Sequence, residues 1–313
     1  MKRIDFLKTS LLSASGLFIG KNATAKGVNN NPLAVVNTIT ILHTNDVHSR
    51  LEAFPMDGGK NQGLGGVAER ATVITNVRKQ AEHVLLLDSG DIFQGTPYFN
   101  LYKGEPEIKA MTEMGYDAST MGNHDFDGGL DNFAAQLKHA TFPIVNCNYN
   151  FDGTVMQNKY KPYIILKKGN VKIGITGVGI ELKGLVPDDL NGGIKYTDPL
   201  AALEKTTAKM KLVEKCDLII CLSHLGYKYA DNKISDIVLA TNSTYTDIIL
   251  GGHTHTFMKA PETYKNKVGA DVIVNQVGFA GIQLGRLDIE MLRNKSKNLA
   301  KASVINIEKK NMD

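Results

Sequence analysis

The sequence predicts an α/β protein in which helices cover β-sheets, and three observations support this prediction. The chain has 313 residues, of which 42% are hydrophobic, enough to bury a substantial core. Short runs rich in β-branched residues alternate with segments of helical periodicity. We find no internal repeat, low-complexity tract or long linker in the sequence. We therefore expect one α/β domain over residues 37–313.

The expected strands are four to seven residues long at their cores and lie between turn-forming residues. They fall within residues 37–44, 83–90, 142–148, 171–179, 216–224, 246–253 and 271–278. Helical patterns occupy residues 66–82, 105–114, 130–139 and 199–215. Strands separated by helical crossovers indicate α/β layering. Residues 282–292 and 302–310 add two further strands, which we expect to pair antiparallel.

The N-terminal segment, residues 1–25, has the pattern of a secretory signal peptide. Lys2 and Arg3 precede an apolar stretch, residues 11–19, which is too short to span a bilayer. Ala23-Thr24-Ala25 then offers a cleavage site of small residues. The stretch "RIDFLK" is similar to a twin-arginine signal, with Ile4 in place of the second arginine. We expect export to the periplasm or the outside of the cell, with residues 26–36 as a connector and no stable membrane anchor.

Charge and cysteine content exclude several classes of protein. The formal net charge of +4 gives no reason to expect binding to nucleic acid or to an acidic membrane. Cys147, Cys216 and Cys221 form no even framework, so we expect core or free thiols. The glycine-rich stretch at residues 58–66 lacks both nucleotide-binding spacings, and we interpret it as a flexible turn before a helix starting at Val67.

Polar side chains of similar chemistry occur in five short motifs, four of which lie at the ends of expected strands. Any one of them alone is better explained as a structural residue, because Asp caps turns and buried His is usually hydrogen-bonded. Ligands collect at the carboxyl ends of strands in α/β sheets, and carboxylate, imidazole and amide ligands suit borderline or hard divalent cations. The joint pattern therefore favours a metal site. The residues are Asp46, His48, Asp91, Asn123, His124, His224, His253 and His255. We expect structural roles for His43, His83 and His139, which lie outside the pattern.

The motifs "ILHTNDVH", "LLLDSGDIFQGTP", "MGNHDFD", "SHLG" and "GGHTH" together resemble those of the calcineurin-type metallophosphoesterase superfamily. The catalytic domain of the 5'-nucleotidase family is the most similar branch, and the resemblance runs from about Thr38 to about Glu290. It implies a four-layer α/β/β/α sandwich. It also implies two divalent metal ions, for which the ligand types suit Zn, Mn, Co or Mg.

The resemblance assigns roles to individual residues. Asp91 would bridge the two ions, as a carboxylate with two oxygens can. His124 would contact the phosphate in the transition state, and Asp127 would orient its ring. Asp125 has no catalytic role in this scheme, and His43, Asn45 and Asp88 are candidates to contact ligands. The first ion would be held by Asp46, His48 and His255, and the second by Asn123, His224 and His253.

The function implied is hydrolysis of nucleoside 5'-monophosphates by attack of metal-activated water. The alternatives are a 2',3'-cyclic nucleotide phosphodiesterase, a UDP-sugar hydrolase, a thiosulfohydrolase-like enzyme, and a non-catalytic metal-binding partner subunit. Full-length 5'-nucleotidases carry a second domain whose aromatic rings hold the nucleobase. This sequence has no Trp and no aromatic residue after Ile282. A separate nucleobase-binding protein is therefore one expected partner, beside the phosphate-ester substrate.

Overall fold

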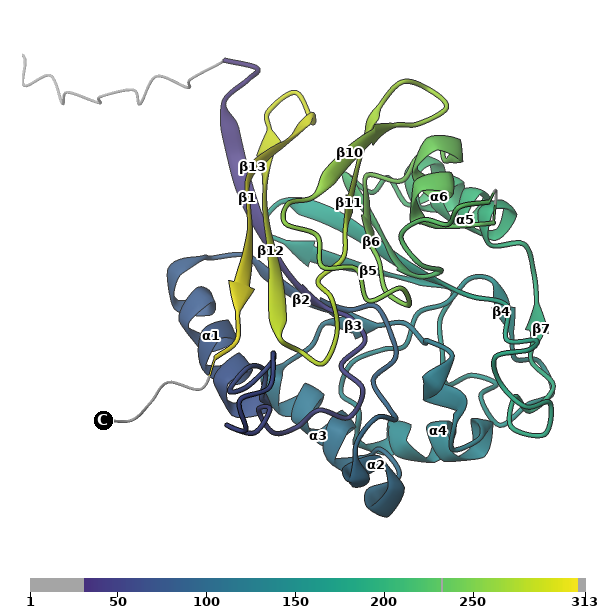
Figure 1. The fold of residues 1–313 in the computed structure, drawn as a ribbon. Coiled ribbons are helices and arrows are strands. Elements are labelled where there is room, and N and C mark those ends of the chain that lie inside the picture. The colour runs from purple at the N-terminus through teal and green to yellow at the C-terminus, as the bar shows by residue number, and fades with distance from the viewer. Residues whose placement is uncertain (1–30, 232, 309–313) are drawn as a thin grey trace, which may run out of the picture.

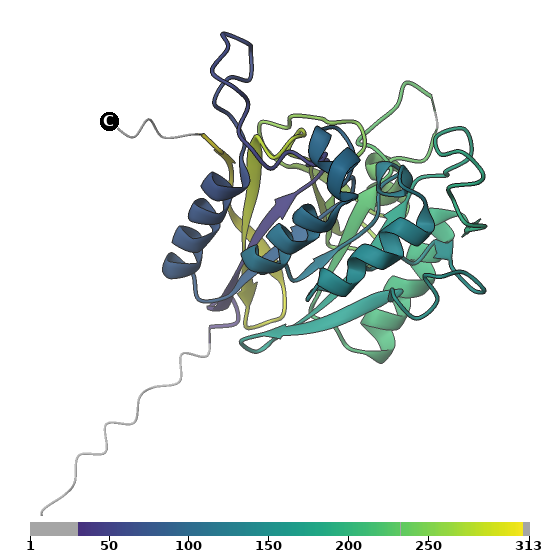
Figure 2. The same cartoon turned by 90° about the horizontal axis from the view of Figure 1, so that it is seen from below.

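Two β-sheets lie face to face, and helices cover the outer face of each (Figures 1 and 2). The computed structural model describes residues 31–231 and 233–308. The four-layer α/β/β/α architecture that the sequence predicts is confirmed. The proposed signal peptide, residues 1–25, lies outside the described residues, and the first strand begins at Val35, within the segment expected as a connector.

The first sheet has the strand order β13-β12-β1-β2-β3. β1 pairs with β2 in parallel and with β12 antiparallel, and β12 and β13 form the expected antiparallel pair. The bounds are β1 (Val35–Thr44), β2 (Val84–Asp88), β3 (Ala118–Ser119), β12 (Gln283–Leu292) and β13 (Lys297–Asn306).

The second sheet has the order β10-β11-β9-β8-β6-β5, with parallel pairing among β11, β9, β8 and β6. A separate two-stranded sheet joins β4 and β7. The bounds are β4 (Tyr149–Asn150), β5 (Tyr163–Lys168), β6 (Val171–Gly179), β7 (Lys195–Tyr196), β8 (Leu218–His224), β9 (Ile248–Leu250), β10 (Glu262–Lys265) and β11 (Asp271–Asn275).

Helices α1 to α4 cover the first sheet, and α5 and α6 lie on the far side of the second (Figure 1). Short turns of 3-10 helix span His124–Phe126 and Leu137–His139, and a π-helical turn, Lys209–Val213, extends α5. The bounds are α1 (Val67–Gln80), α2 (Pro97–Tyr102), α3 (Glu105–Met114), α4 (Leu130–Gln136), α5 (Pro199–Ala208) and α6 (Asp236–Asn242).

Alternation of side chains along the strands divides the interior into layers. In β2, Leu85 and Leu87 face the second sheet, whereas Val84 and Leu86 pack under the helices of the first. In β8, Ile220 faces the first sheet and Cys221 faces α5 and α6. Both faces of these central strands are therefore buried, which explains their nearly continuous apolar sequence.

The strand expected at residues 142–148 is wrong. Only Ile144 and Val145 make isolated bridges there. The Asn146 side chain accepts hydrogen bonds from the backbone N–H groups of Asn148 and Tyr149, which bends the chain into a turn. The two-residue β3 takes the edge position next to β2 instead.

Seven strands and α-helices have no counterpart among the sequence predictions, namely β3, β4, β5, β7, β10, α2 and α6. The two helices have six and seven residues, which is too short for helical periodicity to be read. Cys147, Cys216 and Cys221 are free, as expected. Within the described ranges, no helix combines the length and the apolar character needed to cross a bilayer.

Candidate metal centre

The residues predicted to bind metal meet where strands of both sheets end. Asp46 and His48 follow β1, and Asp91 follows β2. His224 is the last residue of β8, and His253 follows β9. Because parallel strands point their carboxyl ends at one edge of a sheet, residues far apart in the sequence converge there.

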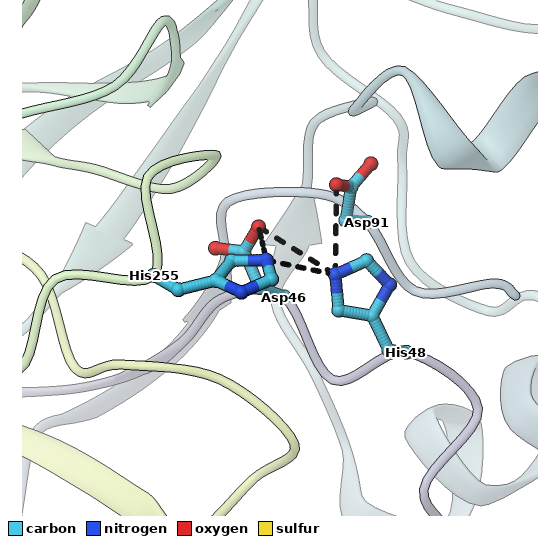
Figure 3. Close-up of side chains that lie close together, drawn as sticks. All are labelled: Asp46, His48, Asp91 and His255. Atoms are coloured by element: carbon cyan, nitrogen blue, oxygen red, sulfur yellow. Dashed lines mark hydrogen bonds and ion pairs between the residues drawn. The ribbon is translucent and has the colours of Figure 1, made fainter. Parts of the chain in front are cut away.

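The first cluster surrounds Asp46. Figure 3 shows the rings of His48 and His255 turned toward this carboxylate. The Nε2 atoms of the two histidines are 3.0 Å apart, and His255 Nε2 lies 3.3 Å from Asp46 Oδ1. Asp91 Oδ2 lies 3.8 Å from His48 Nε2. One donor atom from each of these four residues lies within 4.8 Å of the others.

The second cluster shares Asp91 with the first. His224 Nε2 lies 3.1 Å from Asp91 Oδ2, and Asp91, His224 and His253 also place donor atoms within 4.8 Å of one another. Asn123 Oδ1 lies 2.8 Å from His253 Nδ1. The structure thus brings together every residue that the sequence analysis named as a ligand, in the two groups expected.

The backbone at these positions is unusual. Asp46, His48, Asp91, His253 and His255 all have φ between 50° and 73°, in the left-handed region that side chains with a Cβ rarely adopt. Such conformations cost about 1–3 kcal/mol each and cluster at functional sites. The strain therefore marks these loops as functional, a signal that the sequence does not contain.

Hydrogen bonds hold the loops after β1 and β2 against each other. Asp46 N–H donates to Gly90 O at 2.9 Å, and His48 N–H donates to Asp91 O at 3.0 Å. The carboxylate of Asp88 accepts from the Thr44 and Ser119 hydroxyls at 2.7 and 3.0 Å. Asp88 therefore joins the ends of β1, β2 and β3 and does not itself contact a ligand side chain.

His124 and Asp127 form a pair beside the clusters. His124 Nδ1 lies 2.8 Å from Asp127 Oδ2, and the His124 backbone N–H donates to Asp91 Oδ1 at 2.8 Å. The hydrogen bond with Asp127 raises the pKa of His124, an effect that burial opposes. The His124 side chain is 40% exposed, so its ring is accessible from outside.

The donor set fits divalent cations. Every ion-pair partner of Asp46 and Asp91 among the described residues is a histidine, so no Lys or Arg neutralises these buried carboxylates. His224 Nε2 is fully buried and lies 3.1 Å from Asp91 Oδ2, which is itself a predicted ligand atom. Buried carboxylates without a permanent cation, beside buried imidazole nitrogens, are what a metal ion would satisfy.

The histidines of the two clusters respond differently to their surroundings. Burial lowers the pKa of His48, and burial together with the neighbouring His224 lowers the pKa of His253 to about 4. For His224, burial also disfavours the charge, but the carboxylates of Asp91 and Asp46 outweigh it and raise the pKa to about 10. Low pKa values leave imidazole nitrogens neutral, which is the form that binds metal.

Asp125, for which no catalytic role was expected, has a structural one. Its carboxylate is fully buried and accepts hydrogen bonds from the backbone N–H groups of Asp91, Ile92, Phe93 and Gly122, at 2.8 to 3.1 Å. It therefore links the Asp91 loop to the turn before Asn123. Its place inside the motif "MGNHDFD" was the available signal, but only the fold reveals these partners.

Asn45 and His43 differ in their relation to the site. Asn45 donates to Asp46 Oδ2 at 2.6 Å and so contacts a predicted ligand, as expected. His43 contacts no predicted ligand and lies 2.8 Å from the Asn275 amide. Glu107 was not among the predicted site residues. It is a buried residue of α3 that accepts a hydrogen bond from Ser49, next to His48.

Comparison with known protein families agrees with the geometry of the site. The family model described as Calcineurin-like phosphoesterase matches residues 39–257, which cover both clusters and the His124–Asp127 pair. The chain belongs to the calcineurin-like phosphoesterase family.

Within that family, the chain is similar to proteins named 5'-nucleotidase. The snake venom 5'-nucleotidase of Gloydius brevicauda is 38% identical over 273 residues, covering 80% of this chain and 45% of the relative. The 5'-nucleotidase of Vibrio cholerae is 34% identical over 298 residues, covering 87% and 52%. The chain thus spans about half the length of these relatives.

A solved structure shows the same likeness in three dimensions. The 5'-nucleotidase precursor of Thermus thermophilus superimposes with a TM-score of 0.78 and 30% sequence identity. The match covers 87% of this chain and 55% of that one.

Proposed function

We propose that this protein is an exported dinuclear-metal phosphoesterase that hydrolyses nucleoside 5'-monophosphates to nucleoside and phosphate. One observation carries the proposal. Two clusters of donor atoms share Asp91, and the His124–Asp127 pair lies beside them. The similarity to proteins named 5'-nucleotidase supports the choice of a nucleotide substrate.

Asp91 is the residue that would couple the two metal positions. Its two carboxylate oxygens allow one contact to each ion, and two-metal hydrolases hold their ions ~3.5–4 Å apart. The remaining ligands would be Asp46, His48 and His255 for one ion and Asn123, His224 and His253 for the other. With oxygen and imidazole donors and no thiolate, Zn, Mn, Co and Mg are all compatible.

When bound, divalent ions at such a site polarise phosphoryl oxygens and lower the pKa of water from ~15.7 towards ~7. The chain itself would supply His124. Because Asp127 occupies Nδ1, Nε2 is the nitrogen left for substrate. Asp127 holds the His124 ring in one orientation and raises its pKa. A protonated His124 would place a positive charge beside the phosphate or donate a proton there.

A substrate panel tests the proposal. We expect the purified protein with Mn²⁺ or Zn²⁺ to hydrolyse AMP faster than 2',3'-cyclic nucleotides, UDP-sugars, a thiosulfate ester or an aryl phosphate. A chelator should abolish the activity. Activity that survives the chelator would contradict the two-metal mechanism, and a preference for another ester would redirect the proposal to that substrate.

Two substitutions separate the proposed roles. His124→Ala should lower turnover about 10²- to 10⁴-fold while both metal ions remain bound, because His124 is not a proposed ligand. Asp91→Ala should empty both sites, since both clusters contain Asp91. Metal content by elemental analysis, measured beside turnover, distinguishes the two effects. Loss of metal from His124→Ala would show that its role is misassigned.

Export and a partner are further parts of the proposal. The pattern of residues 1–25 supports a cleavable leader, and N-terminal sequencing of the secreted protein should begin at Lys26. An N-terminus that starts at Met1 would contradict cleavage. That a separate protein supplies a nucleobase-binding domain stays a prediction.

A further inference from the structure

Two of the ligand histidines are oriented by backbone carbonyl groups. His224 Nδ1 lies 2.7 Å from Ser89 O, and His48 Nδ1 lies 3.4 Å from Phe93 O. In both rings, this contact leaves Nε2 to face the metal centre. A hydrogen bond to the second ring nitrogen is the usual way in which proteins fix a metal-binding histidine.

His255 has no such contact. Among the described residues, nothing forms a hydrogen bond with its Nδ1, although its Nε2 points into the first cluster (Figure 3). Its side chain is also more exposed than that of His48, at 40% against 13%. An exposed imidazole held through one nitrogen alone could rotate away from the metal.

Phe279 lies against the ring of His255. The two ring centroids are 5.2 Å apart and the planes differ by only 12°. This arrangement is a stacked pair, and aromatic stacking contributes about 0.5–1.5 kcal/mol beyond burial of area. A flat neighbour restricts rotation of the imidazole out of its plane, as the carbonyl groups do for His48 and His224.

The chain on both sides of Phe279 is tied to the first cluster. Ala280 N–H donates to the carbonyl of Asp46 at 2.7 Å. The Asn45 amide donates both to Gly278 O and to Asp46 Oδ2, each at 2.6 Å. Phe279 therefore keeps a defined position relative to Asp46, the carboxylate that His255 faces.

Phe279 is not part of the hydrophobic core, so core packing does not explain its position. In the part of the chain that the structure describes, Phe279 belongs to none of the buried apolar clusters, and it is partly exposed. Its other aromatic neighbour is Phe257, at 5.8 Å and 78°, which is itself 44% exposed. The contact that Phe279 makes toward the interior of the site is with His255.

We infer that Phe279 is a positioning residue that fixes the His255 ring for one metal ion, the ion of Asp46 and His48. The inference rests on the proposed dinuclear site. In this inference, the face of the Phe279 ring fixes the orientation of His255, as backbone carbonyl groups do for His48 and His224. Loss of that face should therefore weaken one metal position and leave the other unchanged.

The test measures metal affinity in the purified full chain, with Co²⁺ as the probe. We expect two bound ions in the wild type. In Phe279→Leu, one ion should bind about 10- to 100-fold more weakly, the range typical of residues that orient a ligand. Phe279→Tyr keeps the flat ring and should restore wild-type affinity. The visible absorption of Co²⁺ reports the ligand geometry independently of activity.

Two controls make the result specific. Phe142→Leu removes a buried ring from the helix-side core and should leave both affinities unchanged. His255→Asn identifies the affected ion, and Phe279→Leu should weaken the same one. If Phe279→Leu is insoluble, Phe279→Met, which also lacks a flat ring, carries the same prediction.

The outcomes distinguish failure of the proposed role of Phe279 from failure of the proposed dinuclear site. If Phe279→Leu binds Co²⁺ as tightly as the wild type, or if Phe279→Tyr weakens binding as much as Phe279→Leu does, the role of Phe279 is overturned. The dinuclear proposal is not affected by either result. Wild-type protein that binds fewer than two ions would overturn the dinuclear proposal, and the inference with it.

Discussion

Gly122 lies so close to the predicted ligands that no larger residue fits there. A Cβ at this position would lie 2.1 Å from Asp91 Oδ1 and 2.5 Å from His224 Nε2. Gly122 is absent from the glycines with positive φ, so its backbone is accessible to other residues. Glycine is therefore needed here for the space it leaves to Asp91 and His224.

The lack of space for a Cβ at Gly122 leads to a prediction for Gly122→Ala. The methyl group should displace Asp91 and His224 and so weaken metal binding at least ~10-fold, because both clusters contain Asp91. The metal-free protein should keep its secondary structure, which circular dichroism measures. Gly59→Ala, in the exposed loop before α1, is the matched control. Wild-type metal affinity in Gly122→Ala would contradict the steric argument.

Among the elements, the loop after β2 and the turn after β3 depend on one side chain. Asp125 Oδ1 accepts from the N–H groups of Ile92 and Phe93, and Oδ2 accepts from those of Asp91 and Gly122. Burial and the neighbouring Asp91 raise the pKa of Asp125 to about 7, although the N–H donors oppose this. The Asp125 carboxylate thus joins the two loops.

For Asp125→Asn we expect a loss of stability. The amide NH₂ would face two N–H donors, so two hydrogen bonds are lost and buried donors are left unpaired, at a cost of about 2–4 kcal/mol in the free energy of unfolding. Denaturant titration of the metal-free protein measures this. Asp131→Asn, an exposed position in α4, should change stability little. Equal stability of the two variants would refute the role of Asp125.

In the whole molecule, the metal centre needs both sheets, and buried polar contacts join them. Ser89, after β2, donates its hydroxyl to Leu250 O of β9 at 2.8 Å. His43 of β1 accepts from the Asn275 amide of β11 at 2.8 Å when the ring is neutral. Complete burial lowers the pKa of His43 from 6.5 to about 3.

The pKa of His43 predicts how stability depends on pH. The folded pKa lies below that of the unfolded chain, so the unfolded chain takes up the proton first as pH falls. The stability that neutral His43 contributes to the folded protein is fully present above pH 6.5 and is lost between about pH 6.5 and 3. Within that interval, each pH unit removes up to ~1.4 kcal/mol.

His43→Leu should therefore show a shallower decline in the free energy of unfolding between pH 6 and 4 than the wild type. Both proteins are compared in chelator, so that loss of metal ligands at low pH does not contribute. Identical slopes would contradict the assignment, whatever the variant's stability at neutral pH.

Comparison of individual elements shows which features the local sequence pattern predicts correctly. Helix α3 has the predicted bounds, 105–114, because ten residues with a clear apolar face lie between glycines. The residues now found in both clusters were all named from the sequence, since each follows a strand within a short motif. The strand expected at 142–148 was wrong because the Asn146 side chain accepts hydrogen bonds from the backbone N–H groups of Asn148 and Tyr149, which bends the chain locally.

The sequence by itself determined the layered α/β class, the polar residues at the strand ends and the family motifs. These features are encoded by periodicity and short spacing, which act within a few residues. Only the tertiary structure decided the tasks of Asp125, Gly122 and Phe279 and the left-handed backbone of the ligand loops. Those properties depend on contacts between distant segments, such as residues 91 and 125 or 255 and 279, which form only when the loops of the two sheets meet.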